Sequence, residues 1–437
     1  MTEYSITKHK GSNPFIRAVA ACEEEKLHME NNMEDVTVFH EGYGGKEGTS
    51  FFRVFDGFHG QISAVTAARE MLVLVLEQLS KQDPLLSLAK DQVKLLSRFE
   101  ALFQEYYNRP YAGQAQNIAL GLGTKQLENL TNVEQVNLAF TTAFWKMDWV
   151  LGLGKDETSK IRWSGCTALL CLIDSGLPSS DEKEQGTGQE SNIPTPSQEL
   201  QGGRILIADS GKVHAVLYKQ GSGFRLTKER KHILWSGGTI SINKQHGLVE
   251  GLTKATRVLS HYGDRKLKSV IPVPYSVSLP TDPSYQLLVL ASSGLWEVLD
   301  DHAVAERAVI ELTQQKLILK TLCLMQTVED LSISDSVKTR SCSRSEVNVK
   351  ETMADSLKNL TLNYECLAAD ICRELVDTVL VSGSKENISV MVILIQGLDV
   401  LREYTLKGVD KPNKYHTEMS SSRQQVQGGM LDLIVLT

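Results

Sequence analysis

Four short stretches of this 437-residue chain are apolar at almost every position. They cover residues 167–173, 204–208, 213–218 and 287–291. A strand with one solvent-exposed face alternates apolar and polar residues, whereas a strand covered on both faces is apolar throughout. Covering both faces requires a further layer on each side, so these stretches predict stacked β-sheets flanked by helices.

Helical periodicity separates these strands in the sequence. Apolar residues recur at helical spacing over 62–79 and 133–151, and a further helix is expected over 91–107. Thr131 and Glu134 have the spacing of a capping box ahead of the third helix. These helices predict the outer layers of the fold.

Composition restricts the class of function. The chain carries 46 Lys and Arg against 53 Asp and Glu, for a formal net charge of −7. This balance argues against a nucleic-acid partner, since phosphate recognition needs a basic surface. The start of the chain is polar, which predicts no signal peptide, and the most apolar run, residues 71–76, is too short to span a bilayer, so no membrane partner is expected.

Cysteine usage points to a reducing compartment. The seven cysteines include no C-x-x-C pair, which predicts buried free thiols and neither disulfides nor a zinc site. The protein is therefore expected to be intracellular, in the cytoplasm, the nucleus or both.

One large domain is expected over residues 1–401. Two polar segments rich in Ser, Gly or charged residues, at about 175–203 and 327–352, are expected to be insertions, because strand and helix patterns resume after each. Residues 402–437 form a C-terminal tail of unassigned role.

A carboxylate ends one predicted strand. A β-hairpin is expected over 36–40 and 50–55, and the second strand runs into Asp56-Gly57. Asp-Gly is a common turn dipeptide, so the local sequence favours a plain turn. A carboxylate fixed at the end of a strand could also bind a hard cation.

Four further motifs accompany Asp56-Gly57 in a fixed order. They are M-E-D at 33–35, S-G-C-T-A at 164–168, A-S-S-G-L-W-E-V at 291–298 and G-S-K-E-N-I-S-V at 383–390. Together they resemble the metal-dependent type 2C serine/threonine protein phosphatases, with this chain as a degenerate member. The resemblance implies an α+β fold, a four-layer αββα sandwich in which helices flank two antiparallel sheets. It also implies two Mn²⁺ or Mg²⁺ ions whose bridging water attacks a phosphate.

Several residues match the family's metal ligands. The resemblance places Asp56 and the Gly57 carbonyl at ligand positions, with Glu34 and Asp35 as the acidic pair of M-E-D. Glu386 stands where the family has aspartate, which keeps the charge on a longer side chain. These residues predict a remnant metal site, with a turn carboxylate and a solvated acidic pair as the equally weighted alternative.

Other positions depart from the metal site. Ser293 replaces a metal-binding aspartate with a neutral hydroxyl, and Lys212 places a cation where the family has an acid. His261 aligns with a further aspartate, although a local insertion could bring Asp264 to that place. Weak Mn²⁺ or Mg²⁺ binding, or none, is the expected result.

The substrate side departs as well. Glu30 stands where the family has an arginine that holds the substrate phosphate, so attraction is replaced by repulsion. Phe58 takes the place of the general acid that follows Asp-Gly, and His59 lies one residue later. His59 could act as a displaced acid only if the turn restored a reach of about 3 Å.

These substitutions favour a catalytically impaired phosphatase-like protein that serves as a binding or scaffolding module for a protein partner of unknown identity. An active Mn²⁺- or Mg²⁺-dependent serine/threonine phosphatase with a rearranged site around Asp56, Glu34, Glu386 and His59 is the alternative. Phosphopeptide binding without turnover is a third hypothesis, and Glu30 is unfavourable for it.

Overall fold

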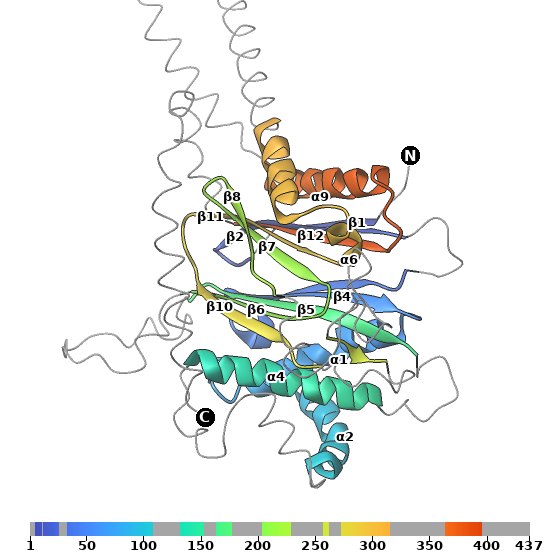
Figure 1. Cartoon of the computed structure of the whole chain (residues 1–437). Helices are drawn as coiled ribbons and strands as arrows, with labels where there is room; N and C mark the ends of the chain where they lie inside the picture. The colour runs from blue at the N-terminus through green and yellow to red at the C-terminus, as the bar shows by residue number, and fades with distance from the viewer. Residues whose placement is uncertain are drawn as a thin grey trace, which may run out of the picture.

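Two antiparallel β-sheets lie face to face at the centre of the protein, as Figure 1 shows. The computed structural model describes residues 5–10, 12–25, 33–107, 132–152, 163–176, 203–228, 257–261, 272–314 and 363–395. The first sheet has the strand order β1-β2-β12-β11-β7-β8, and the second has the order β10-β6-β5-β4-β3. A short strand, β9, pairs with β5 at one end of the second sheet.

The strands of the first sheet are β1 (Ser5–Lys10), β2 (Ile16–Glu24), β7 (His214–Lys219), β8 (Ser222–Arg225), β11 (Tyr285–Ala291) and β12 (Ile388–Ile395). Those of the second sheet are β3 (Val36–Glu41), β4 (Thr49–Phe58), β5 (Gly165–Asp174), β6 (Arg204–Ser210), β9 (Leu259–Ser260) and β10 (Tyr275–Pro280). The four apolar stretches of the sequence fall in β5, β6, β7 and β11, which confirms that they are strands.

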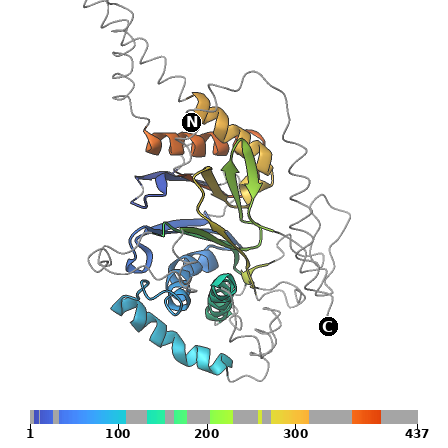
Figure 2. The same cartoon turned by 90° about the vertical axis from the view of Figure 1, so that its left-hand side faces the viewer.

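Helices cover both outer faces of the pair of sheets (Figures 1 and 2). Helices α1 (Ile62–Leu79), α2 (Lys90–Tyr107) and α4 (Asn132–Leu151) lie outside the second sheet, and a short 3-10 helix, η1 (Tyr43–Gly45), precedes β4. Helix α9 (Tyr364–Val381), a helix over 301–314 and the single turn α6 (Ser293–Trp296) lie against the first sheet. The expected α+β four-layer αββα sandwich is confirmed.

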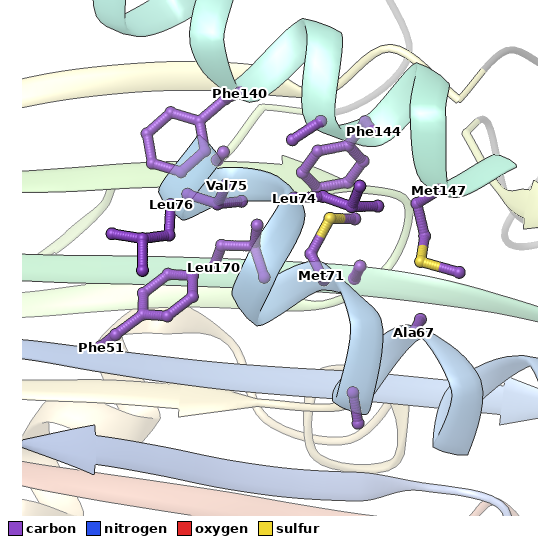
Figure 3. Close-up of a cluster of buried hydrophobic side chains, with 14 of the residues drawn as sticks. Phe51, Ala67, Met71, Leu74, Val75, Leu76, Phe140, Phe144, Met147 and Leu170 are labelled. Carbon is purple, nitrogen blue, oxygen red and sulfur yellow. The ribbon is translucent and has the colours of Figure 1, made fainter. Parts of the chain in front are cut away.

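Three apolar clusters fill the spaces between the four layers. The central cluster joins the sheets. It includes Phe52, Val54 and Leu169 from one sheet and Leu288 from the other. A second cluster lies between α9 and the first sheet. The third packs α1 and α4 on the second sheet, and Figure 3 shows its buried side chains around Met71.

Strand β4 extends further than the sequence indicated. The strand was expected to end at Asp56, and this is wrong, because β4 continues to Phe58. Asp56, Gly57 and Phe58 pair with Thr167, Cys166 and Gly165 of β5, respectively. The turn therefore begins at His59, and Asp56 lies inside β4, paired with β5 and one residue beyond the last pair between β3 and β4.

Some expectations lie outside the described residues. They are most of the insertion at 175–203, the insertion at 327–352, the tail at 402–437 and Thr131 of the capping box. The domain boundary at 401 stays a prediction.

The described cysteines are free thiols. Cys22, Cys166, Cys171 and Cys372 are buried, whereas Cys366 is exposed. Burial raises the pKa of Cys22 to about 12, which makes this thiol a poor nucleophile.

Among the helices of the described ranges, none is both long and apolar enough to cross a membrane.

Removal of the Phe144 ring tests the packing of α4 on α1. Phe144 is fully buried in the third cluster (Figure 3), so Phe144→Ala is expected to lower the free energy of unfolding by about 3–5 kcal/mol in urea titrations. Val381→Ala is the control, since Val381 is 90% exposed, and should change it by less than about 0.5 kcal/mol. Equal effects of the two variants would contradict this packing.

Candidate functional site at one end of the sandwich

Two glycines allow the predicted motifs to meet. A Cβ atom at Gly57 would lie 2.2 Å from the Glu34 carbonyl oxygen, so only glycine permits M-E-D and D-G to approach this closely. A Cβ atom at Gly294 would lie 2.2 Å from the Asn387 carbonyl oxygen in the same way. The backbone thus brings four of the five motifs together in two pairs, one on each sheet, and the fifth, at 164–168, pairs with the end of β4.

A hydrogen bond connects the two pairs of motifs across the sandwich. The backbone N–H of Ser293, at the start of α6, donates to Asp56 Oδ2 of β4 at 2.9 Å. Asp56 belongs to the second sheet, and α6 directly follows β11 of the first sheet. The end of the sandwich is therefore closed by a polar contact between residues 237 positions apart in sequence.

Serine side chains secure the first-sheet half of the site. Ser292 and Ser389 exchange two hydrogen bonds, from Ser292 N to Ser389 O and from Ser389 N to Ser292 Oγ, both at 2.9 Å. The Ser292 hydroxyl also donates to the Asn387 carbonyl at 3.3 Å. These contacts fix the ends of β11 and β12 next to each other, beneath Ser293.

Asp35 is a buried carboxyl group at the centre of the site. Burial and the neighbouring charge of Asp56 raise its pKa well above the usual range. Ser292, Ser389 and the Gly57 N–H lie where hydrogen bonding lowers the pKa, but none of them reaches an Asp35 oxygen with good hydrogen-bond geometry. An unpartnered buried carboxylate is costly, so the anionic form of Asp35 is disfavoured.

Asp56 is subject to opposing influences. Burial raises its pKa, while the hydrogen bonds from Ser293 and the positive charge of Lys212 lower it, and the charge of Glu386 raises it. Lys212 also forms a salt bridge with Glu297, with Nζ 3.5 Å from Oε1. A protein cation therefore lies close enough to Asp56 to act on its charge.

Three rings form a cluster beside this site. Phe58 lies edge-on to His59 and His261, with ring centres 5.7 and 5.1 Å away, and the two histidine rings lie nearly parallel at 5.7 Å. Asp56 and Phe58 are two residues apart in a strand, so their side chains share a face of β4. Phe58 thus occupies the side of the strand from which a proton donor would reach the site.

The residues present do not fit a two-ion Mn²⁺ or Mg²⁺ centre. Hard cations need several oxygen donors, and in the described part of the chain no three His, Cys, Asp or Glu side chains come together in a metal-binding arrangement. Ser293 offers Asp56 hydrogen bonds from its backbone and its neutral side chain, and Lys212 already supplies positive charge there. At the centre of the site the described residues include one buried acidic pair, Asp35 and Asp56.

The structure places most of the predicted site residues at this end. Glu34 accepts a hydrogen bond from the Gly60 N–H at 2.5 Å, and Glu386 is exposed in the connection from α9 to β12. Glu30 and Asp264 lie outside the described residues. The sequence reasoning missed the serine pair Ser292 and Ser389, although both lie inside the quoted motifs.

Comparison with known proteins points to one family. Residues 115–332 match the protein phosphatase 2C family. Protein phosphatase 2C-like domain-containing protein 1 of Homo sapiens is 31% identical over 473 aligned residues, which cover 90% of this chain and 74% of that protein. The protein of the same name from Mus musculus is 35% identical, over 69% of this chain and 50% of that protein.

Solved structures give more distant likenesses. A phosphatase from a pathogenic strain of Toxoplasma gondii is 15% identical, with a TM-score of 0.49 over 90% of this chain and 96% of that one. A sex-determining protein of C. elegans is 14% identical, with a TM-score of 0.48 over 92% of this chain and 67% of that one.

The sandwich and the ordered motifs define a type 2C phosphatase-like domain. The chain belongs to the protein phosphatase 2C family, as the identity to the human relative over most of both lengths shows.

The raised pKa of Asp35 predicts a pH-dependent stability. Between the unfolded-state pKa, about 3.9, and the raised folded-state pKa, the folded protein binds more protons than the unfolded chain, so stability falls as pH rises. Asp35→Asn removes this cost. In metal-free urea titrations the variant should gain stability over wild type as pH increases from 4.5 to 7.5.

Asp282→Asn serves as the matched control of opposite sign. Hydrogen bonds from Ser284 and the Lys219 ammonium group lower the pKa of Asp282 to about 2, so its charge stabilises the fold above the unfolded pKa and this benefit is lost on acidification. Its variant should lose stability at pH 7.5. A gain for Asp35→Asn that did not change with pH would refute the assignment.

Proposed function

We propose that this protein is a catalytically impaired type 2C phosphatase that serves as a protein-binding or scaffolding module. The observation that carries the proposal is the contact between Ser293 and Asp56. Asp56 Oδ2 accepts the Ser293 N–H at 2.9 Å, so Ser293 lies beside Asp56, and its neutral side chain supplies no carboxylate there to share the binding of a hard cation.

Charge at the site supports the same proposal. In the family's mechanism, divalent ions balance the carboxylates and activate water. Here the charge of Lys212 acts on Asp56, and Lys212 also pairs with Glu297, so part of the acidic charge is balanced without an ion. A metal would have to compete with this lysine, which favours weak Mn²⁺ or Mg²⁺ binding or none.

The position of the proton donor supports it further. Phe58 lies on the Asp56 face of β4 and has no proton to give. His59 follows it with a positive φ of 57°, and its ring contacts are those with Phe58 and His261. His59, the displaced candidate acid, is therefore held by ring contacts and not by contacts that would direct it at a substrate.

Preservation of the scaffold supports a binding role. The buried central cluster, the glycine contacts at Gly57 and Gly294 and the Ser292–Ser389 pairing keep the backbone of the site in place. A folded surface without turnover can still recognise a protein. The proposal includes a protein partner and an intracellular location.

A phosphatase assay tests the proposal. The wild-type chain should hydrolyse p-nitrophenyl phosphate and a phosphothreonine peptide only at the background rate, with or without millimolar Mn²⁺. The reason is that the site offers the ion too few oxygen ligands. Asp56→Asn should give the same rate as wild type. Mn²⁺-dependent hydrolysis that Asp56→Asn abolishes would instead establish the active alternative with a rearranged site.

Restoration of the family residues provides the complementary test. The variant carries Glu30→Arg, Phe58→His, Lys212→Asp, Ser293→Asp and Glu386→Asp. It restores the family's phosphate-binding arginine, its general acid and its metal-binding aspartates together. Mn²⁺-dependent hydrolysis by this variant, but not by wild type, would locate the loss at these positions. Tighter binding of a phosphopeptide than of its unphosphorylated form by wild type would favour the phosphopeptide hypothesis.

A further inference from the structure

Two histidines that are far apart in sequence meet at the rim of the site. His59 follows β4 and His261 follows β9, yet their rings lie 5.7 Å apart between centres and only 12° from parallel. Phe58 packs edge-on against both rings. Neither imidazole is needed for the proposed binding role, so the pairing calls for its own explanation.

Ser164 holds the two histidine segments in place. This fully buried serine donates from Oγ to the Gly60 carbonyl at 2.8 Å, and its own carbonyl accepts the His261 N–H at 3.1 Å. The Gly60 N–H is held in turn by Glu34. Ser164 thus positions His261 directly and His59 through the neighbouring Gly60, as preorganised ligands are positioned.

The protonation of His261 is fixed by a backbone carbonyl. His261 Nδ1 lies 2.9 Å from the Trp163 carbonyl oxygen, which can only accept a hydrogen bond. The proton of the neutral ring therefore resides on Nδ1, and Nε2 carries the lone pair. A carbonyl bonded to one imidazole nitrogen is the usual second-shell arrangement of a metal-binding histidine.

The separation of the rings suits a shared ion. With a Zn–N distance of about 2.0–2.1 Å, each ring centre stands about 3 Å from the metal, so two rings on one ion have centres about 5–6 Å apart. The observed 5.7 Å falls in this range. A bound ion lies in the plane of each imidazole, so metal binding requires one side chain to rotate out of the parallel arrangement until both Nε2 atoms point at the ion.

We propose that His59 and His261 form a two-nitrogen site for a borderline divalent transition metal, of which Zn²⁺ is the probe. Imidazole nitrogen suits Zn²⁺ and its neighbours, whereas Mg²⁺ and Mn²⁺ prefer oxygen. This site is distinct from the acidic pair Asp35 and Asp56 and does not depend on the proposed loss of turnover. Water completes the coordination, because the protein supplies two ligands.

Calorimetric titration of the full chain with ZnCl₂ tests the site. Both histidines have positive φ, 57° at His59 and 67° at His261, so asparagine, which tolerates this conformation, is the suitable replacement. His59→Asn and His261→Asn should each weaken Zn²⁺ binding about tenfold or more, since even loss of a second-shell partner costs 10–100-fold. Circular dichroism should show unchanged folding.

His302→Asn is the matched control. His302 lies on the helix over 301–314 with its side chain 87% exposed, and its replacement should leave the affinity unchanged. The proposal is overturned if wild type binds no Zn²⁺ at millimolar concentration, or if only one of the two histidine variants loses affinity. It is also overturned if the His302 variant loses as much affinity as either of them.

Discussion

The face-to-face packing of two sheets is the constraint on which the other features depend. Residues of β4 and β5 pack against residues of β11 and β12 through the central apolar cluster, and this contact sets the distance between the ends of β4 and β11. Only at that distance can the Ser293 N–H reach Asp56. The helical layers then cover the outer faces, because each sheet still presents apolar side chains on that side. The geometry of the site therefore depends on the packing of the core.

Shape and charge have separate origins at this site. The shape comes from backbone contacts that a side chain would prevent, at Gly57 and Gly294. The charge comes from side chains that can change without disturbing those contacts, such as Lys212, which lies on a turn after β6 and reaches Glu297. The proposed loss of divalent-ion chemistry would consequently require no change of fold. The acidic pair, Asp35 and Asp56, can stay buried whichever side chains surround it, because the backbone contacts hold the site.

The sequence predicted the layers of the fold better than the ends of its elements. Continuous apolar runs marked β5, β6, β7 and β11, and helical spacing marked α1, α2 and α4. Strand β10, whose sequence Y-S-V-S-L-P mixes polar and apolar residues, was missed, because it lies at the edge of its sheet and is only partly buried. The end of β4 was placed too early, since pairing with β5 overrides the turn preference of Asp-Gly. The site residues came from the resemblance, but the meeting of His59 and His261 depends on tertiary structure, and no local pattern signals it.

The close approaches at Gly57 and Gly294 also bear on how resemblance should be weighed. A comparison of sequences counts a match at these glycines in the same way as a match at an acidic position, although the two kinds of position have different roles. In this chain they carry different information: the glycines record that two backbones must still touch, while the acidic positions record whether an ion can be held. Members of a family can therefore share nearly all of the signature that defines its architecture while differing at the few atoms that perform the reaction. Inheritance of a fold and inheritance of an activity have to be read from separate sets of residues.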